Sequence, residues 1–94
     1  MNRTVQDNAQ HSRYELELEG GTAFIDYRRQ GKVRILTHAE VPPAFRGQGV
    51  AERLTAGALE LVRAQGEKVV PRCPYVALFI RRHPQFQDLV ESDS

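Results

Sequence analysis

A glycine-punctuated loop, Arg46-Gly47-Gln48-Gly49-Val50-Ala51, has the residue types and spacing best suited to chemistry in this chain. It lies between a predicted strand and a predicted helix. The first turn of a helix presents unpaired N–H groups and a partial positive charge, which together bind phosphate. Gly47, Gly49 and Ala51 suit such a site because a bulky Cβ would hold a pyrophosphate away from the backbone. The alternative is a plain strand-to-helix turn in which the glycines only permit close packing, and the spacing alone leaves both open.

Two common nucleotide-binding motifs do not fit this loop. A P-loop needs Gly-x-x-x-x-Gly-Lys-Ser/Thr, and the sequence contains no such run. A dinucleotide fingerprint, Gly-x-Gly-x-x-Gly, would need glycine where Glu52 stands. That fingerprint also needs a parallel sheet larger than 94 residues can build.

Three further side chains are candidates for proton transfer or nucleophilic attack. His38 and Glu40 lie two residues apart on the strand before the loop, so they share a face of that strand. Cys73 follows a short strand and precedes a predicted helix, a position that favours the reactive thiolate. Each has a structural alternative: a solvated strand face for His38 and Glu40, and a small, half-buried packing residue for Cys73.

Apolar patterns predict the elements that position these groups. Residues 13–19, 22–28 and 32–41 alternate between apolar and polar side chains, as half-buried strands do, with glycines in the turns between them. A helix over 50–65 follows the loop. The face expected to be buried in the third strand carries Val33, Ile35, Thr37, Ala39 and Val41.

The second half completes the fold class. A short strand at 67–71 and a second helix at 75–83 follow the first helix, and strand, helix, strand in this order predicts a locally parallel pair. The chain is therefore predicted to be an α+β protein, an antiparallel meander followed by helix, strand and helix. We expect residues 1–12 to form a flexible N-terminal arm, 13–90 a single domain, and 91–94 a frayed acidic tail.

Length and composition exclude several classes of function. The 94 residues, 10.7 kDa, provide for one hydrophobic core. Thirteen basic against twelve acidic residues give a net charge of +1, without the excess typical of nucleic-acid binding. No apolar run is long enough for a membrane span or a signal peptide. A single cysteine forms no internal disulfide, so a cytoplasmic location is expected, and no metal site is predicted.

The loop also resembles the acetyl-CoA signature of the GNAT superfamily of N-acetyltransferases, Arg/Gln-x-x-Gly-x-Gly/Ala, which here reads Arg46-x-x-Gly49-x-Ala51. Segments 41–47, 69–76 and 81–84 are similar to a small, single-domain branch of that superfamily. The resemblance implies a minimal acyl-CoA-binding fold in which the strands at 32–41 and 67–71 splay apart. Pantetheine would enter that gap and pair with exposed backbone.

The resemblance also implies roles for individual residues. Glu40 would be the general base with His38 beside it. Alignment puts Ile80 where many GNAT enzymes carry a tyrosine acid, so Cys73 would replace that acid or accept the acetyl group covalently. A basic cluster at 81–83 would either reach cofactor phosphates or form a solvated helix face. The residues implied to contact acetyl-CoA or CoA are Val41, Arg46, Gly47, Gln48, Gly49, Val50, Ala51, Arg53, Val70 and Cys73.

The function implied is transfer of an acetyl group from acetyl-CoA to a small-molecule or peptide amine. The alternative is a CoA- or acyl-CoA-binding module with little or no turnover. Neither nucleic acid nor membrane is an expected partner, and the chain is expected to be a monomer or a weak dimer.

Overall fold

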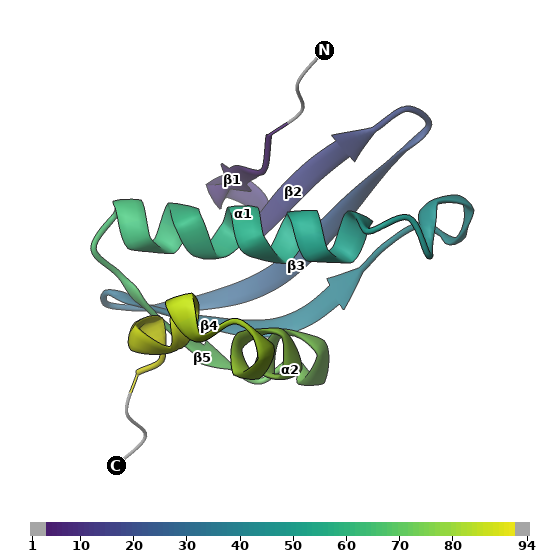
Figure 1. Ribbon diagram of the computed structural model, residues 1–94. Coiled ribbons are helices and arrows are strands. Elements are labelled where there is room, and N and C mark those ends of the chain that lie inside the picture. Colours follow the sequence, from purple (N-terminus) through teal and green to yellow (C-terminus); the bar gives the residue numbers. More distant parts are fainter. Residues whose placement is uncertain (1–3, 92–94) are drawn as a thin grey trace.

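The alternating segments of the first half fold as the predicted antiparallel meander. In the computed structural model, which describes residues 4–91, β2 (Arg13–Leu18) pairs with β3 (Gly21–Gln30), and β3 pairs with β4 (Val33–Glu40) (Figure 1). The turns place Gly20 and Gly31 at φ of 95° and 61°. Glycine adopts these positive values without the strain that other residues would incur, so the two turns occur where the sequence predicts them.

A short strand precedes the meander. β1 (Gln6–Asn8) pairs antiparallel with β2 and leads into a 3-10 turn at Ala9–His11. Within the stretch 1–12 that we expect to form a flexible arm, residues 6–8 thus pair with the sheet and 9–11 form a turn. Three residues are too few to show an alternating pattern, so this strand has no local sequence signal. Of the frayed tail expected at 91–94, residues 92–94 lie outside the described residues, as do 1–3.

A β-bulge interrupts the register between β3 and β4. Asp26 pairs with His38, but the next residue, Tyr27, pairs with Leu36, so Thr37 is left without a partner on β3. The Thr37 hydroxyl donates a hydrogen bond to the backbone carbonyl of Asp26 at 3.3 Å. An extra residue of this kind reverses which side chains face the core on the two sides of the bulge.

Because of the bulge, the buried face of β4 differs from the one predicted before residue 37. Ala39 and Val41 pack against the core as predicted, but before the bulge Arg34 and Leu36 are the buried residues. Val33, Ile35 and Thr37, which a single alternation placed inside, are half-buried or exposed.

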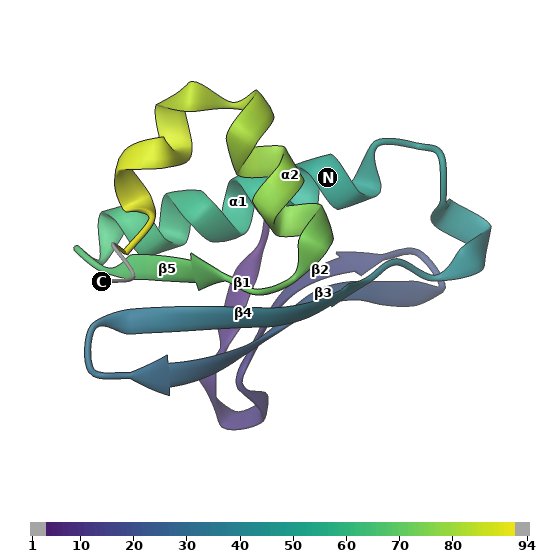
Figure 2. The same cartoon turned by 90° about the horizontal axis from the view of Figure 1, so that it is seen from below.

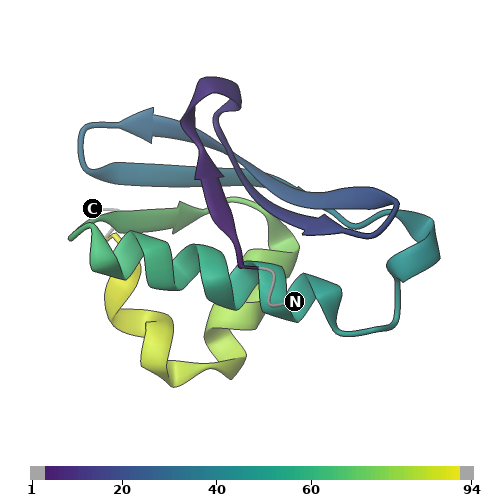
Figure 3. The same cartoon turned by 90° about the horizontal axis from the view of Figure 1, so that it is seen from above.

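The second half confirms the predicted helix, strand and helix. α1 (Val50–Ala64) crosses the sheet, β5 (Lys68–Pro71) returns parallel to β4, and α2 (Pro74–Arg82) follows. A 3-10 turn at Pro84–Leu89 then lies against α1 and α2. Figures 2 and 3 show both helices and this turn on the same face of the sheet. Neither helix is long and apolar enough to cross a membrane, a finding that covers residues 4–91.

A buried arginine ties together distant parts of the chain. The Arg34 side chain is only 2% exposed and forms ion pairs with Asp7 at 3.1 Å and Glu67 at 3.2 Å. Its guanidinium lies 4.5 Å from the centre of the Tyr27 ring, and it donates a hydrogen bond to the Tyr14 hydroxyl. A charge this deeply buried needs opposing charge and hydrogen bonds, and because Asp7 and Glu67 both supply them, β1 and the residue before β5 are tied to β4.

Candidate functional site

The glycine loop delivers the first turn of α1 to the protein surface. Gly49 is the residue before the helix, with φ of 75°, and no side chain caps the first turn by a hydrogen bond. Gly47 has φ of 79°, and a Cβ there would meet no atom within 4 Å. The loop therefore presents uncapped helix amides beside a residue without a side chain, with the Glu52 carboxylate nearby, and uncapped amides of this kind can bind a phosphate.

The pairing between the two parallel strands ends before this loop. Their last paired residues are Leu36 on β4 and Pro71 on β5. Beyond them the Cys73 N–H donates to the Leu36 carbonyl at 2.9 Å, and α2 then begins at Pro74. β4 continues to Glu40 without a β5 partner. All four residues of β5 pair with β4, so the open stretch of β4 arises because β5 ends there, and the splay that the resemblance implied for the strands at 32–41 and 67–71 stays a prediction.

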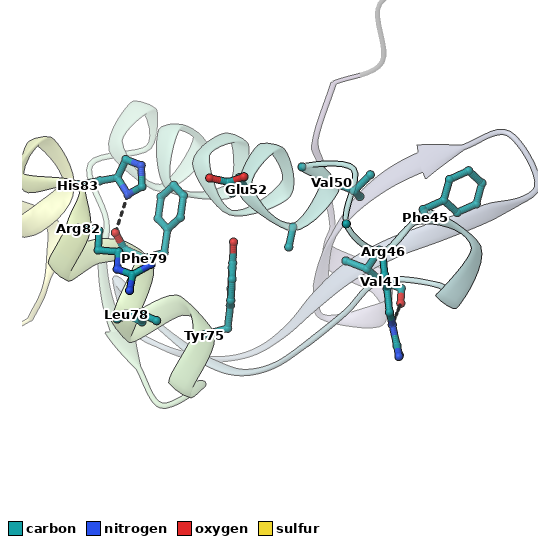
Figure 4. Close-up of a pocket in the computed structure, with 13 residues that line it drawn as sticks. Val41, Phe45, Arg46, Val50, Glu52, Tyr75, Leu78, Phe79, Arg82 and His83 are labelled. Carbon is teal, nitrogen blue, oxygen red and sulfur yellow. Dashed lines mark hydrogen bonds between the residues drawn. The ribbon is translucent and has the colours of Figure 1, made fainter.

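A cleft of about 410 Å³ lies between the loop, the start of α1 and one side of α2 (Figure 4). Apolar side chains contribute much of its lining, and polar groups come from both helices. Its residues are Val41, Phe45, Arg46, Gly47, Gly49, Val50, Ala51, Glu52, Tyr75, Leu78, Phe79, Arg82 and His83.

Six of the ten predicted cofactor contacts line this cleft: Val41, Arg46, Gly47, Gly49, Val50 and Ala51. The other four lie elsewhere. The Gln48 amide donates back to the Ala44 carbonyl at 3.2 Å, and Arg53 lines a separate hollow beside Val5. Val70 is half-buried on β5, and Cys73 is 5% exposed within the core.

The structure brings His38 and Glu40 together, on the outer face of the sheet. His38 Nε2 lies 3.0 Å from Glu40 Oε1, and the two side chains are 57% and 54% exposed. Both residues follow the Thr37 bulge on β4 and do not line the cleft. The helices cover the opposite face, so the pair is separated from buried Cys73 by the sheet itself. Within residues 4–91, no three His, Cys, Asp or Glu residues are grouped as a metal site would need.

Tyr75 and Glu52 are cleft residues that the sequence did not single out for a role. The Tyr75 phenol crosses the cleft from α2 towards Glu52 on α1 (Figure 4). Burial, with a further contribution from the Glu52 carboxylate, raises the pKa of Tyr75 above its ordinary value. The phenol is therefore protonated at neutral pH and can donate a hydrogen bond. Ile80, which stands where the resemblance would put a tyrosine, is buried in the core.

The end of α2 brings positive charge to the cleft. Arg82 and His83 line it, whereas Arg81 does not. The His83 ring stacks on Phe79 with their centres 3.9 Å apart, and His83 Nδ1 lies 2.7 Å from the Phe79 carbonyl oxygen. These contacts fix the imidazole at the rim. Arg82 and His83 lie on the side of the cleft away from Arg46 (Figure 4), and both interpretations of the basic cluster at 81–83 stay predictions.

The chain is similar in sequence to one known family and to several known proteins. A family model described as GCN5-related N-acetyl-transferase matches residues 13–89. A mouse protein, Protein NATD1, is 31% identical over 83 residues, which cover 85% of this chain and 76% of the mouse protein. Protein NATD1 of Xenopus tropicalis is 30% identical over 83 residues, with the same shares covered. The zebrafish (Danio rerio) Protein NATD1 is 29% identical over 91 residues, covering 92% of this chain and 83% of its own length.

Proposed function

Because the chain belongs to the GCN5-related N-acetyl-transferase family, we propose that it transfers an acetyl group from acetyl-CoA to an amine. The observation that carries this proposal is the position of the cleft. It joins the uncapped N-terminus of α1 to Val41, the residue that directly follows β4, whose last residues have no β5 partner. One end of the site thus suits an anionic phosphate, and the other suits an extended, amide-bearing chain.

The residues present fit this cofactor. The first-turn amides of α1 lack a side-chain acceptor, and Gly47 leaves the approach to them open. Arg82 and His83 supply further donors at the rim. Backbone groups of β4 after Leu36 are free of β5 and would pair with the amides of pantetheine.

When bound, acetyl-CoA would supply an activated acyl thioester. The chain then has to remove a proton from the acceptor ammonium and to return one to the leaving sulfur. Glu40, with His38 at 3.0 Å, is our candidate for the first task because both side chains reach solvent beside the bulge. Tyr75 is our candidate for the second, since its protonated phenol projects into the cleft.

Cys73 remains a second candidate for the acid and the only thiol for a covalent step. Its thiol is buried and does not line the cleft, which favours Tyr75. Mass measurement after a single turnover separates these roles. An acetyl adduct on Cys73 would establish the covalent route, and unchanged turnover in Cys73→Ala would exclude both roles for the thiol.

A CoA-binding module with little turnover is the second candidate function. The observation in its favour is buried Ile80, which stands where the resemblance to GNAT enzymes would put a tyrosine acid. Under either function we propose a cytoplasmic location, consistent with the single free thiol.

Thermal unfolding with and without ligand tests both functions. Acetyl-CoA and CoA are expected to raise the melting temperature in a concentration-dependent manner, by preferential binding to the folded state. Release of free CoA thiol is then measured over a panel of amines. A melting shift with thiol release supports the transferase, a shift without release supports the binding module, and no shift excludes both.

A further inference from the structure

β1 is joined to the rest of the sheet by a turn that lies entirely on the surface. Residues 9–12 are all exposed, and the turn projects from the margin of the sheet (Figures 2 and 3). The buried core begins at Tyr14 on β2, after this turn. Opening the turn would therefore detach residues 4–8, here called the β1 segment, and leave the core residues in place.

The closed turn has a conformation that its residues disfavour. Ser12 has φ of 53° and is the one non-glycine residue with positive φ within residues 4–91. Residues other than glycine rarely adopt this left-handed region. The Ser12 N–H donates to the Ala9 carbonyl at 3.2 Å, and the His11 N–H donates to the Asn8 side chain at 3.3 Å, so hydrogen bonds hold the turn closed. An extended chain at 9–12 would release this conformational cost.

The β1 segment nevertheless makes specific contacts with the rest of the fold. Asp7 pairs with Arg34 at 3.1 Å and accepts a hydrogen bond from the Tyr27 hydroxyl. Val5 packs against α1 at Gly57, where a Cβ would come within 2.7 Å of the Val5 Cβ. If the segment left, the buried Arg34 guanidinium would lose one of its two carboxylates, which is strongly destabilising. A vacated site therefore favours the binding of an equivalent segment.

The pairing register of β1 and β2 can continue through the turn. Asn8 pairs with Arg13 at the end of the ladder. In the same register, residues 9–12 would pair with residues 12–9 of a second copy, and no residue would be left over. One chain cannot form these pairs, because the turn must reverse its direction. Two copies related by a two-fold axis can form them as one continuous antiparallel ladder.

We propose that two copies of this chain exchange their β1 segments, so that each segment docks on β2 and α1 of the other copy. Asp7 of each copy would then pair with Arg34 of the other, and Ser12 would be extended. The docked contacts are the same in both forms, and the turn keeps a chain's own segment close by. The monomer therefore dominates in dilute solution, and exchange appears as the chain concentration approaches the effective concentration of the tethered segment, on the order of mM. No residue that lines the α1–α2 cleft belongs to the segment or the turn, so the proposal does not rest on acetyl transfer.

Disulfide formation between two cysteine variants tests the exchange. Val5→Cys, carrying an affinity tag, would be mixed with untagged Gly57→Cys at about 1 mM, then diluted and oxidised. Exchange brings the two new thiols together across copies, because positions 5 and 57 are in contact. We expect a roughly 10-fold higher yield of tagged–untagged covalent dimer than from Val5→Cys mixed with Arg63→Cys. Arg63 is the matched control because it also lies on α1 but contacts Asp88 instead.

Shortening the turn is the second test. Deleting residues 9–11 leaves Ser12 alone between β1 and β2, and an antiparallel reversal needs at least two residues. A chain's own segment can then no longer dock, so light scattering should find mainly dimer at about 10 μM, where the intact chain is a monomer. Adding Asp7→Asn to the deletion variant should weaken the dimer roughly tenfold, whereas adding the exposed change Asp88→Asn should not.

Equal yields of covalent dimer from the two cysteine mixtures would overturn the proposal, and so would a folded deletion variant that stays monomeric. If the deletion variant does not fold, the cysteine mixtures decide alone. A dimer of the intact chain that forms without linking positions 5 and 57 would indicate association through another surface and would also overturn the exchange. Melting shifts with acetyl-CoA and thiol release test the proposed transferase separately.

Discussion

Asp7 on β1 and Arg34 on β4 form an ion pair 27 positions apart in the sequence, with Nη1 of Arg34 3.1 Å from Oδ2 of Asp7. Asp7 also accepts a hydrogen bond from the Tyr27 hydroxyl. The shortest strand of the described sheet is therefore held by polar contacts to two side chains of the core.

Replacing Asp7 by asparagine should destabilise the fold. The amide of Asp7→Asn carries no charge, so the buried guanidinium would keep Glu67 as its one remaining carboxylate in the cluster. We expect a loss of about 2 kcal/mol in the free energy of unfolding. Urea unfolding followed by circular dichroism measures this. Asp88→Asn is the control, since its ion pair with Arg63 at 2.9 Å is exposed and should contribute little. Equal effects of the two variants would contradict the role assigned to Asp7.

Alkaline pH should weaken the same cluster. Burial, together with the hydrogen bond to Asp7, raises the pKa of Tyr27 to about 12, and burial likewise raises the pKa of Tyr14. The unfolded chain loses the Tyr27 proton near pH 10, before the folded chain does, so stability is intact below about pH 10 and falls as pH rises towards about 12. Over that range Tyr27 should account for about 2–3 kcal/mol. Unfolding free energies at about pH 9, 10 and 11 measure the decline, and Tyr27→Phe should flatten it.

Gly47 should be required for cofactor binding and Gly66 should not. Both have positive φ, 79° and 69°, and at neither would a Cβ meet an atom within 4 Å. Alanine at either position therefore imposes a similar backbone strain, of about 1 kcal/mol. Only Gly47→Ala places a methyl group at the phosphate approach, and we expect it to weaken acetyl-CoA binding roughly tenfold. Calorimetric titration of both variants checks this, and equal affinities would exclude the loop as the phosphate site.

Removing the Tyr75 hydroxyl should slow turnover without affecting cofactor affinity. Tyr75→Phe keeps the ring in the cleft but loses the proton donor, so kcat should fall about 10²-fold while the Kd for acetyl-CoA stays unchanged. The loss should be smaller for acyl donors with more acidic leaving thiols, because they need less protonation. An unchanged kcat would instead favour Cys73 as the proton donor to the leaving sulfur.

Glu52 should oppose cofactor binding. Its carboxylate lies 3.8 Å from where a Cβ of Gly49 would be, close to the amides proposed to bind phosphate. Glu52→Gln removes a negative charge from this region, and we expect CoA to bind about 2- to 5-fold more tightly. Glu60→Gln, further along α1, is the matched control. Weaker binding in Glu52→Gln would show instead that this carboxylate supports the loop.

The elements of the fold were largely predictable, but their finer geometry was not. The periodicity at 50–65 located α1 to within a residue, because an amphipathic helix buries one stripe whatever surrounds it. The bulge at Thr37 has no such pattern. Val33 and Ile35 are as apolar as Leu36, so either face of β4 could have been buried, and pairing with β3 decides between them.

The candidate site, like the fold, was only partly predictable from the sequence. The loop at 46–51 was predictable because glycine spacing and a helix start are local features. Tyr75 was not, because whether its phenol enters the cleft depends on how α2 is rotated against α1. The burial of Cys73 could not be predicted for a related reason: its position before a helix is visible in the sequence, whereas the packing around it is not.

The end of the described chain has a consequence for how copies of this protein behave in a crowded solution. Val90 bridges to Val69, and the Glu91 N–H donates to the Val69 carbonyl at 2.8 Å, so the free side of β5 is covered. The opposite margin of the sheet is β1, which spans three residues. Neither margin offers a long template to which a foreign strand could add. On β2 and β4 the backbone without a neighbouring strand is confined to residues 16–18 and 37–40, and both stretches are too short for a long foreign strand to add.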